Sequence, residues 1–237
     1  LTEYLSTTQI LPKNADWAGW VKTWNDFGFT KYYINSGIAV AGGVLCAIFF
    51  NGLMAYVLAV LKPKGHKIVL ALVMWCLLIP PTTSFVALFV NIKKIGLTGS
   101  FVPLWLTMGA NAYWVILFKN YFESLPRDYI DAARIDGCGT FGVFTRIVLP
   151  LSKTILAVLS INTFLSSWNN FFWPFLVTSK EAMYTIQVGL KQFKFANTTL
   201  FGPMMAGATI SALPMFILFF CLQKYFLEGV TVGAVKG

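Results

Sequence analysis

Charged residues are scarce in this chain. Lys, Arg, Asp and Glu make up 11% of its 237 residues, whereas hydrophobic residues make up 57%. Because a soluble domain carries about 25% charged residues, this composition excludes an ordinary soluble fold. Five stretches lack charge altogether, and each is long enough for the roughly 20 apolar residues that a helix needs to cross a bilayer. These stretches are residues 32–61, 68–92, 95–118, 154–179 and 195–223.

Residues that build catalytic or metal sites are also rare. His66 is the only histidine, and the four cysteines form no Cys-x-x-Cys pair, which argues against a metal site or a disulfide framework. The phosphate-binding pattern GxxxxGK[ST] is absent. We therefore expect a non-catalytic chain that binds no metal or cofactor and does not itself hydrolyse ATP. Its net charge of +9 is spread over loops on both sides of a membrane, which favours contact with anionic lipid over nucleic acid.

The uncharged stretches predict membrane-spanning helices. Continuous apolar runs such as 37–61 do not show the alternation of barrel strands, and a helix satisfies its own backbone hydrogen bonds in hydrocarbon. The predicted fold class is an all-α integral membrane protein with five spans in this chain. The Ile79-Pro80-Pro81 step is expected to break the second span. The predicted spans are 32–61, 68–91, 103–119, 151–178 and 204–226.

An odd number of spans places the two ends of the chain on opposite sides. Residues 1–31 are predicted to lie outside the cytoplasm, and the loop 120–150 and the tail 227–237 inside it. Counted between the uncharged stretches, the inner segments then carry ten Lys and Arg residues and the outer segments eight, a bias with the sign of the positive-inside rule. Because Leu1 is not an initiator methionine, we expect a further span upstream, which would make six.

The loop between the third and fourth predicted spans has the residue pattern of a short helix. Pro126 suits the first turn, where its missing N–H is not needed. Asp128 and Asp131 suit the positive end of the helix dipole. Gly137 is predicted to end the helix in a left-handed conformation.

Two features of this predicted helix indicate that another protein docks on it. Ala132, Ala133 and Gly137 place small side chains near its C-terminal end, which lets another surface approach closely. Asp136 lies at the negative end of the helix dipole, where an acidic side chain costs about 0.3–1 kcal/mol. We therefore expect Asp136 to have a partner, either a nearby arginine of the loop or a group on another protein.

The same loop resembles the signature of a known transporter family. The matching residues are Asp131, Ala132, Ala133, Asp136, Gly137, Ile147, Leu149 and Pro150. Their spacing is that of the EAA motif of ABC importer permeases, in which glutamate is usual at the position of Asp131. Other segments resemble the sugar-uptake branch, and the tail is similar to that of a maltose-type subunit. These segments are Tyr33–Ser36, Ala55-Tyr56, Trp168–Pro174, Gln187–Leu190 and Gly229–Gly237.

The resemblance implies a type I ABC importer permease fold in a bacterial inner or plasma membrane. It also implies partners: a second, related permease subunit, two ABC ATPase subunits that bind ATP and magnesium, and an extracytoplasmic sugar-binding protein. The loop helix would be the coupling helix, part of a rigid lever continuous through Ile147–Pro150 with a transmembrane helix. The ATPase subunits would also contact the C-terminal residues, which are Gly233, Ala234, Val235, Lys236 and Gly237.

Contacts with the sugar and with the binding protein are expected from uncharged residues. A polar cluster in the fourth predicted span either lines the sugar pathway or forms hydrogen bonds between helices. Its members are Asn162, Ser166, Ser167, Trp168, Asn169 and Asn170. Phe195, Asn197 and Thr198 lie where the resemblance places a loop that reaches into the binding protein.

Other classes of protein are less well supported. A secondary transporter usually needs an intramembrane charge or an ion site at a broken helix, and a channel needs a pore loop or a ring of charges. The five uncharged stretches supply no Asp, Glu, Lys or Arg for either purpose. A membrane enzyme would lack histidine or cysteine partners for the acids of the inner loop. An ABC importer permease for another solute, such as an amino acid or a polyamine, remains the main alternative.

Overall fold

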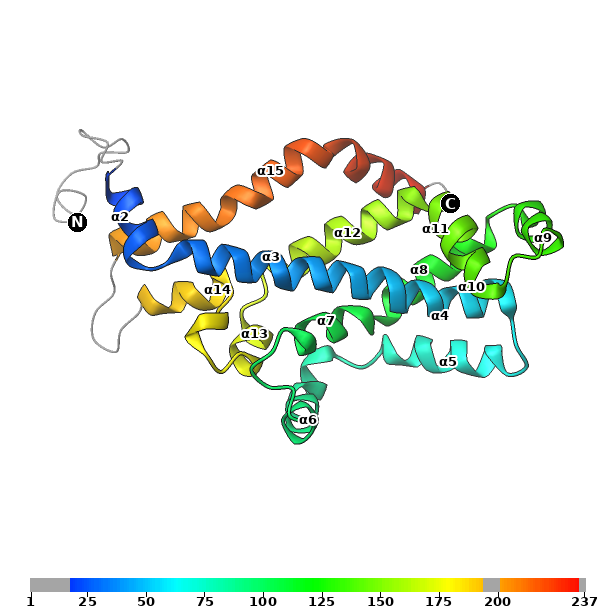
Figure 1. Cartoon of the computed structure of the whole chain (residues 1–237), viewed down its shortest axis with the longest axis horizontal. Coiled ribbons are helices and arrows are strands. Elements are labelled where there is room, and N and C mark those ends of the chain that lie inside the picture. The colour runs from blue at the N-terminus through cyan, green and yellow to red at the C-terminus, as the bar shows by residue number, and fades with distance from the viewer. Residues whose placement is uncertain (1–17, 194–200, 235–237) are drawn as a thin grey trace.

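The computed structural model of the chain describes residues 18–193 and 201–234. These residues form helices and short connections, with no β-strand among them. Figure 1 shows an elongated arrangement in which the longest helices run roughly along one direction. The elements are α2 (Ala18–Asp26), α3 (Phe29–Cys46), η1 (Ala47–Asn51), α4 (Gly52–Tyr56), η2 (Val57–Leu61), α5 (His66–Cys76), α6 (Pro81–Lys94), α7 (Val102–Gly109), α8 (Ala112–Glu123), α9 (Arg127–Ile135), α10 (Thr140–Val143), η3 (Phe144–Val148), α11 (Leu149–Leu151), α12 (Lys153–Trp168), α13 (Phe172–Val177), η4 (Glu181–Met183), α14 (Ile186–Gly189), η5 (Leu190–Phe193) and α15 (Phe201–Ala234).

The first span is one continuous helical rod of 33 residues, Phe29–Leu61. It consists of α3 and α4 with two π-helical segments, η1 and η2. Gly42 lets α7 pack close to this rod, because a Cβ at that position would lie 2.2 Å from Nε1 of Trp105. The Trp105 indole N–H donates to the carbonyl of Ile38 at 3.1 Å. A larger residue than glycine at position 42 would therefore displace α7.

The second predicted span is broken, as expected. Helices α5 and α6 meet at an angle of 104°. Pro80 at this bend has an extended backbone, with ψ of 128°, which is the conformation preferred by a residue that precedes a proline. The predicted break at the Pro80-Pro81 step is confirmed.

The chain bends where the inner loop meets the fourth predicted span, and the sequence did not predict this bend. The helical segment Thr140–Leu151 and α12 meet at 83°. At the junction, the buried hydroxyl of Ser152 donates to the carbonyl of Val148 at 2.7 Å, a type of bond that often bends helices. Pro150, just before the junction, cannot donate a backbone hydrogen bond. The prediction of a helix continuous through Ile147–Pro150 with a transmembrane helix is therefore wrong, because the helix breaks after Leu151.

The third predicted span, 103–119, is split into two short helices, α7 and α8. The buried side chain of Asn51 bonds to both sides of the split. Its amide donates to the Met108 carbonyl at 3.0 Å, and its oxygen accepts from the Asn111 N–H at 2.9 Å. These bonds satisfy backbone groups that would each cost several kcal/mol if left unpaired in hydrocarbon.

Helix length and composition support fewer spans than the sequence predicts. In the described residues, Phe29–Leu61 and Gly202–Cys221 are each long and apolar enough to cross a membrane. Counting each of the two bent pairs as one further span raises the number to four. The split pair α7 and α8 is not among them, so the count of five stays a prediction.

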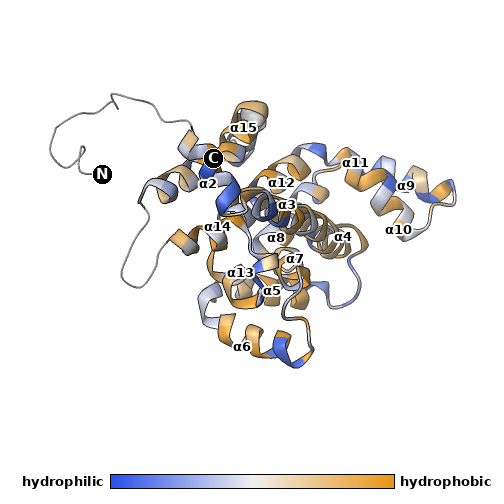
Figure 2. Cartoon of the chain, turned by 60° about the vertical axis from the view of Figure 1, so that its left-hand side comes forward, coloured by the Kyte–Doolittle hydropathy of each residue, from blue (hydrophilic) through white to orange (hydrophobic). Residues whose placement is uncertain are grey.

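The two ends of the molecule carry different parts of the chain. Helices α9 and α10 and the turn between α4 and α5 lie at one end, as does the C-terminal end of α15 (Figure 1). Helices α2 and α14 lie toward the other end. In Figure 2, hydrophilic residues mark α9 and the turn after α4, whereas α4 and α5 are mainly hydrophobic. The polar loop is thus presented beyond one end of the apolar helices.

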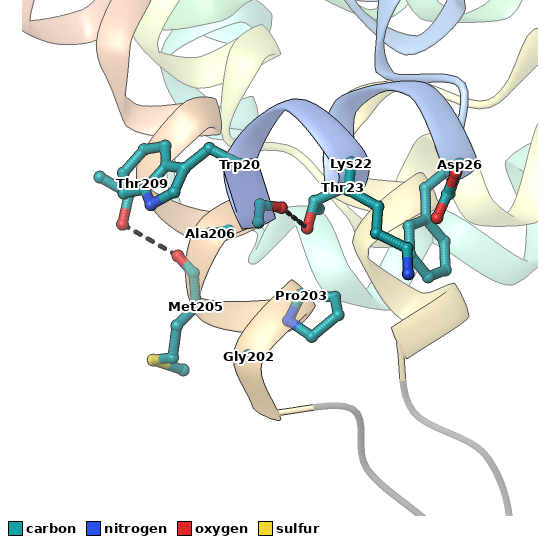
Figure 3. Close-up of a pocket in the computed structure, with 11 residues that line it drawn as sticks. Trp20, Lys22, Thr23, Asp26, Gly202, Pro203, Met205, Ala206 and Thr209 are labelled. Atoms are coloured by element: carbon teal, nitrogen blue, oxygen red, sulfur yellow. Dashed lines mark hydrogen bonds between the residues drawn. The ribbon is translucent and has the colours of Figure 1, made fainter. Parts of the chain in front are cut away.

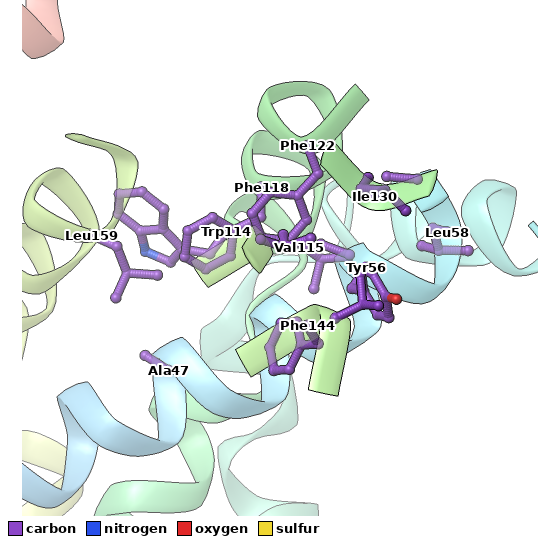
Figure 4. Packing of buried hydrophobic residues seen from close by; sticks show 14 of the residues in the cluster. Ala47, Tyr56, Leu58, Trp114, Val115, Phe118, Phe122, Ile130, Phe144 and Leu159 are labelled. Atoms are coloured by element: carbon purple, nitrogen blue, oxygen red, sulfur yellow. The ribbon is translucent and has the colours of Figure 1, made fainter. Parts of the chain in front are cut away.

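The largest buried cluster joins this polar loop to the first span. Figure 4 shows its aromatic and aliphatic side chains converging from α4, α8, α9, η3 and α12. Three aromatic residues of α8 contribute, and the rings of Phe118 and Phe122 stack with centroids 5.5 Å apart. Its members include Ala47, Tyr56, Leu58, Trp114, Val115, Phe118, Phe122, Ile130, Ala133, Phe144 and Leu159. Helix α9 is therefore packed onto the transmembrane core and is not a free connector.

Candidate functional site

Helix α9 is the short helix that the loop sequence predicts. Gly137, just beyond its C-terminus, has φ of 82°. The Gly137 N–H donates to the Arg134 carbonyl at 3.0 Å. The Cys138 N–H donates to the Ala133 carbonyl at 2.9 Å. These two bonds form the Schellman arrangement of helix ends, and they confirm the predicted left-handed cap at Gly137.

The exposed side of α9 carries a stripe of three uncharged residues. Tyr129, Ala132 and Ile135 are spaced three residues apart, which places them on one side of a helix. Tyr129 and Ile135 are 56% and 86% exposed, and Ala132 is exposed between them. We call these three residues the α9 stripe. Two large exposed side chains therefore flank a small one on this side of the helix.

The opposite side of α9 is buried against the core. Ile130 and Ala133 belong to the cluster shown in Figure 4. Ala133, which the motif places among the docking residues, therefore contacts this chain's own core and not the exposed surface. Asp131, Asp136 and Gly137 are exposed, as docking residues must be.

The acidic residues of α9 differ in their partners. An Asp131 carboxylate oxygen lies 3.8 Å from the Arg134 guanidinium, and both side chains are largely exposed. Asp136 forms no ion pair with any residue that the structure describes. The expectation that Asp136 has a partner, either an arginine of the loop or a group on another protein, stays a prediction.

The second half of the motif lies in η3 and α11. Ile147 and Leu149 pack against the same core cluster as Ala133, so the fold brings the two halves of the motif into one packing unit. Pro150 lies within α11, immediately before the 83° bend. Ile147 and Leu149 belong to the packing that holds α9 on the core, and they are not part of the exposed side of α9.

A polar pocket of about 300 Å³ lies between α9 and the ends of the first span and α8. Glu123 at its edge bridges two lysines, with oxygens 2.9 Å from Lys62 Nζ and 2.7 Å from Lys119 Nζ. Hydrogen bonds from Lys119 and Lys62 lower the pKa of the Glu123 carboxyl below its ordinary value. Arg127 and Arg134 line the same pocket. This bridge ties the end of the first span to the end of α8.

The predicted polar cluster is divided between two environments. Asn162, Ser166 and Asn169 are exposed, and their spacing of four and three residues places them on one side of α12. Ser167 and Trp168 are buried, and Trp168 donates its indole N–H to the carbonyl of Ser211 at 2.9 Å. The side chain of Asn170, which is partly buried, accepts from the backbone N–H of Trp173 at 3.2 Å.

The opposite end of the molecule contains a second pocket, of about 450 Å³, between α2 and the start of α15. Figure 3 shows Trp20 and Lys22 of α2 on one side and Pro203 and Met205 of α15 on the other. The residues predicted to contact a binding protein, Phe195, Asn197 and Thr198, lie outside the described residues. So do Val235, Lys236 and Gly237 of the predicted tail, whereas Gly233 and Ala234 belong to α15.

Two residues with clear structural roles were not singled out as sites by the sequence. Asn51, which holds the split between α7 and α8, is a lone asparagine in an apolar run, and that isolation was the available signal. The Tyr56 hydroxyl contacts the loop at Thr140, although Tyr56 lies in the first span. The sequence could not place these contacts, because their partners are 60 and 84 residues away along the chain.

Comparison with known proteins identifies the class to which this fold and loop belong. The model of the family described as "Binding-protein-dependent transport system inner membrane component" matches residues 43–232. The chain belongs to this family and is a permease of the ABC importer class. The predicted family resemblance and membrane location are confirmed.

Individual relatives agree with this assignment. The chain is 37% identical to the probable ABC transporter permease protein YurM of Bacillus subtilis, an alignment that covers 96% of this chain and 76% of the relative. It is 34% identical to the arabinooligosaccharides transport system permease protein AraQ of the same organism, over 88% and 74% of the two chains. It is 31% identical to the melibiose/raffinose/stachyose import permease protein MelC, over 98% and 85%.

One solved structure is similar to the whole fold. It is the crystal structure of a bacterial ABC transporter involved in the import of the acidic polysaccharide alginate. The matched chain has a TM-score of 0.82 and 24% sequence identity, and the match covers 94% of this chain and 84% of that one. This likeness confirms the predicted permease fold.

Proposed function

We propose that this chain is the permease subunit of an ATP-driven importer for a neutral oligosaccharide. It forms half of the translocation pathway, and a second, related permease forms the other half. Relatives named for the transport of arabinooligosaccharides and of melibiose, raffinose and stachyose support a sugar substrate. The uncharged spans favour neutral sugars, because saccharide hydroxyls need hydrogen-bonding groups and aromatic faces but no countercharge.

The α9 stripe is the observation that carries this proposal. An ATPase subunit seats on Tyr129, Ala132 and Ile135, with the exposed carboxylates of Asp131 and Asp136 at the edges. The capped helix is held on the core by its buried face, so a force applied to the stripe acts on a defined body. ATP and magnesium are bound and used by two such ATPase subunits, and this chain has no catalytic role.

The exposed polar residues of α12 belong to the sugar pathway in this proposal. Asn162, Ser166 and Asn169 present amide and hydroxyl groups that match the hydroxyls of a sugar. Polar residues of this kind are seldom placed in a membrane span without a role. Ser167, Trp168 and Asn170 instead hold the packing around α12 and position these three.

The end of the molecule with α2 and α14 faces an extracytoplasmic sugar-binding protein, and the chain's C-terminal residues reach toward the ATPase subunits. The residues involved are those expected from the sequence, Phe195, Asn197 and Thr198 in the outer loop and Gly233–Gly237 in the tail. One end of the elongated fold thus faces the binding protein, and the other end faces the ATPase subunits.

Gentle purification of the chain from its native membrane tests the proposal. The expected result is an assembly that contains an ABC ATPase and a second permease, and whose ATP hydrolysis rises when a sugar-loaded binding protein is added. A screen of neutral and acidic oligosaccharides then identifies the substrate class. A stable, solitary chain with no ATPase in the mildest detergent would contradict the proposal.

A further inference from the structure

We infer that Tyr56 is a positioning residue that transmits movement of the docking loop to the first span. This inference rests on the proposed docking of an ATPase on α9. It assigns to one hydroxyl group the polar connection between the loop helices and the rod Phe29–Leu61. If the hydroxyl is removed, the loop should still bind the ATPase but should transmit less movement to the rod.

The position of Tyr56 supports this role. It is the last residue of α4, and its side chain is 1% exposed. Its hydroxyl donates to the Thr140 carbonyl, at the start of α10, at 3.1 Å. Tyr56 also belongs to the buried cluster that contains Ile130 and Ala133 of α9. One side chain of the rod therefore bonds to the start of α10 and packs in the cluster that holds α9.

The need for such a connection follows from the shape of the loop. Helices α9 and α10 are separated at residues 136–139 and do not form one continuous lever. Apolar packing of Ile130 and Ala133 holds α9 on the core, but such packing is not directional. A hydrogen bond depends strongly on distance and angle. The Tyr56 hydroxyl therefore fixes the orientation of the loop helices relative to the rod.

The surrounding packing makes the hydroxyl removable without loss of the fold. The Tyr56 ring lies against the Phe144 ring, with centroids 5.4 Å apart, and phenylalanine preserves that contact. The Thr140 carbonyl also accepts the backbone N–H of Phe144, so it is not left unpaired. The matched control is Tyr33→Phe, because the Tyr33 hydroxyl donates to a backbone carbonyl of another span, that of Ile210, far along the rod from the loop.

The experiment compares Tyr56→Phe, Tyr33→Phe and the unmodified chain in the complete transporter, reconstituted in vesicles with its binding protein. Basal ATP hydrolysis and the amount of co-purifying ATPase should be unchanged in all three. Sugar transported per ATP hydrolysed should fall about fivefold in Tyr56→Phe, the lower end of typical coupling between sites, and stay normal in Tyr33→Phe. Equal transport ratios in the two variants would overturn the inference.

A second variant separates positioning from general weakening. Arg134→Gln removes the positive charge of α9 that acts on the Tyr56 hydroxyl. If both groups act through one contact, the double variant should lose no more transport per ATP than the worse single variant. Additive losses would overturn the shared contact. If the unmodified assembly lacks an ATPase, the proposed function itself fails, and that result is distinct from normal coupling in Tyr56→Phe.

Discussion

The side-chain oxygen of Asn51 accepts a hydrogen bond from the backbone N–H of Asn111, 2.9 Å away. The same side chain donates to the Met108 carbonyl at 3.0 Å. A split helix inside a membrane is tolerated where the protein itself pairs the freed backbone groups. Asn51 provides that pairing with both ends of one amide, so a single side chain makes the split between α7 and α8 possible.

Replacement of Asn51 by leucine should therefore destabilise the protein. The variant leaves the Met108 carbonyl and the Asn111 N–H without the partner that Asn51 provides, and an unpaired group of this kind costs about 1–3 kcal/mol where it is shielded from water. We expect a clear fall in the midpoint of thermal unfolding in detergent. Asn120→Leu, at an exposed position of α8, is the control and should change the midpoint little. Equal midpoints for the two variants would show that Asn51 does not hold the split.

The two adjacent alanines of α9 should respond differently to a larger side chain. Ala132→Leu places a bulky side chain in the middle of the exposed stripe, so it should abolish sugar-stimulated ATP hydrolysis while the permease keeps its thermal stability. Ala133→Leu overpacks the buried face and should cost about 1–3 kcal/mol of stability. Normal stimulated hydrolysis in Ala132→Leu would exclude the stripe as the docking surface. Thermal unfolding and ATPase assays on both variants separate the two effects.

Gly137→Ala should destabilise the end of α9 because of the backbone conformation at this position and not because of a steric clash. A Cβ at Gly137 would meet no atom within 4 Å, but its φ of +82° strains any L side chain. The expected loss is about 1–2 kcal/mol, seen as faster hydrogen exchange at the C-terminal end of α9. Gly139→Ala is the matched control, since Gly139 has an ordinary φ of −66° and similar open space. Equal exchange in both variants would contradict the strain argument.

The Glu123 bridge should make stability depend on pH. Lys119 and Lys62 lower the pKa of the Glu123 carboxyl in the folded protein. The contribution of this carboxylate to stability is therefore present above the ordinary pKa of a glutamate and is lost as the pH falls through the lowered value. Glu123→Gln should therefore unfold at a lower temperature than the unmodified chain at pH 7. The gap should close as the pH falls below the ordinary pKa of a glutamate and through the lowered one, and it should shrink in high salt. A gap that is constant with pH would exclude the charged bridge as its cause.

The exposed polar residues of α12 should affect sugar handling alone. Asn162→Leu and Ser166→Ala remove hydrogen-bonding groups from the proposed pathway, so the sugar concentration for half-maximal transport should rise several-fold. Basal ATP hydrolysis should not change. Ser160→Ala is the control, because that hydroxyl bonds to the Leu156 carbonyl of its own helix at 2.7 Å. Transport that is unaffected by Asn162→Leu would remove this face of α12 from the pathway.

Helix α9 was the part of the candidate site that could be predicted best. Its start, its acidic first turn and its glycine cap are local features, in which residues a few positions apart decide the backbone conformation. Asp131, Ala132 and Gly137 were identified by their spacing, and the structure exposes all three. The spacing did not predict that Ala133 is buried, because the packing partners of α9 determine which side of the helix faces the core.

The membrane class, the helical character and the cap of α9 could be predicted, because they follow from residue composition and from contacts within one or two helical turns. The assembled fold was needed to show that the chain bends by 83° at the start of the fourth predicted span, that Asn51 bonds across a split 60 residues away, and that Tyr56 bonds to the loop. Each of these depends on which distant segments meet. The pairing of distant backbone groups in a low-dielectric core is a property of the assembled fold, so no local pattern records it.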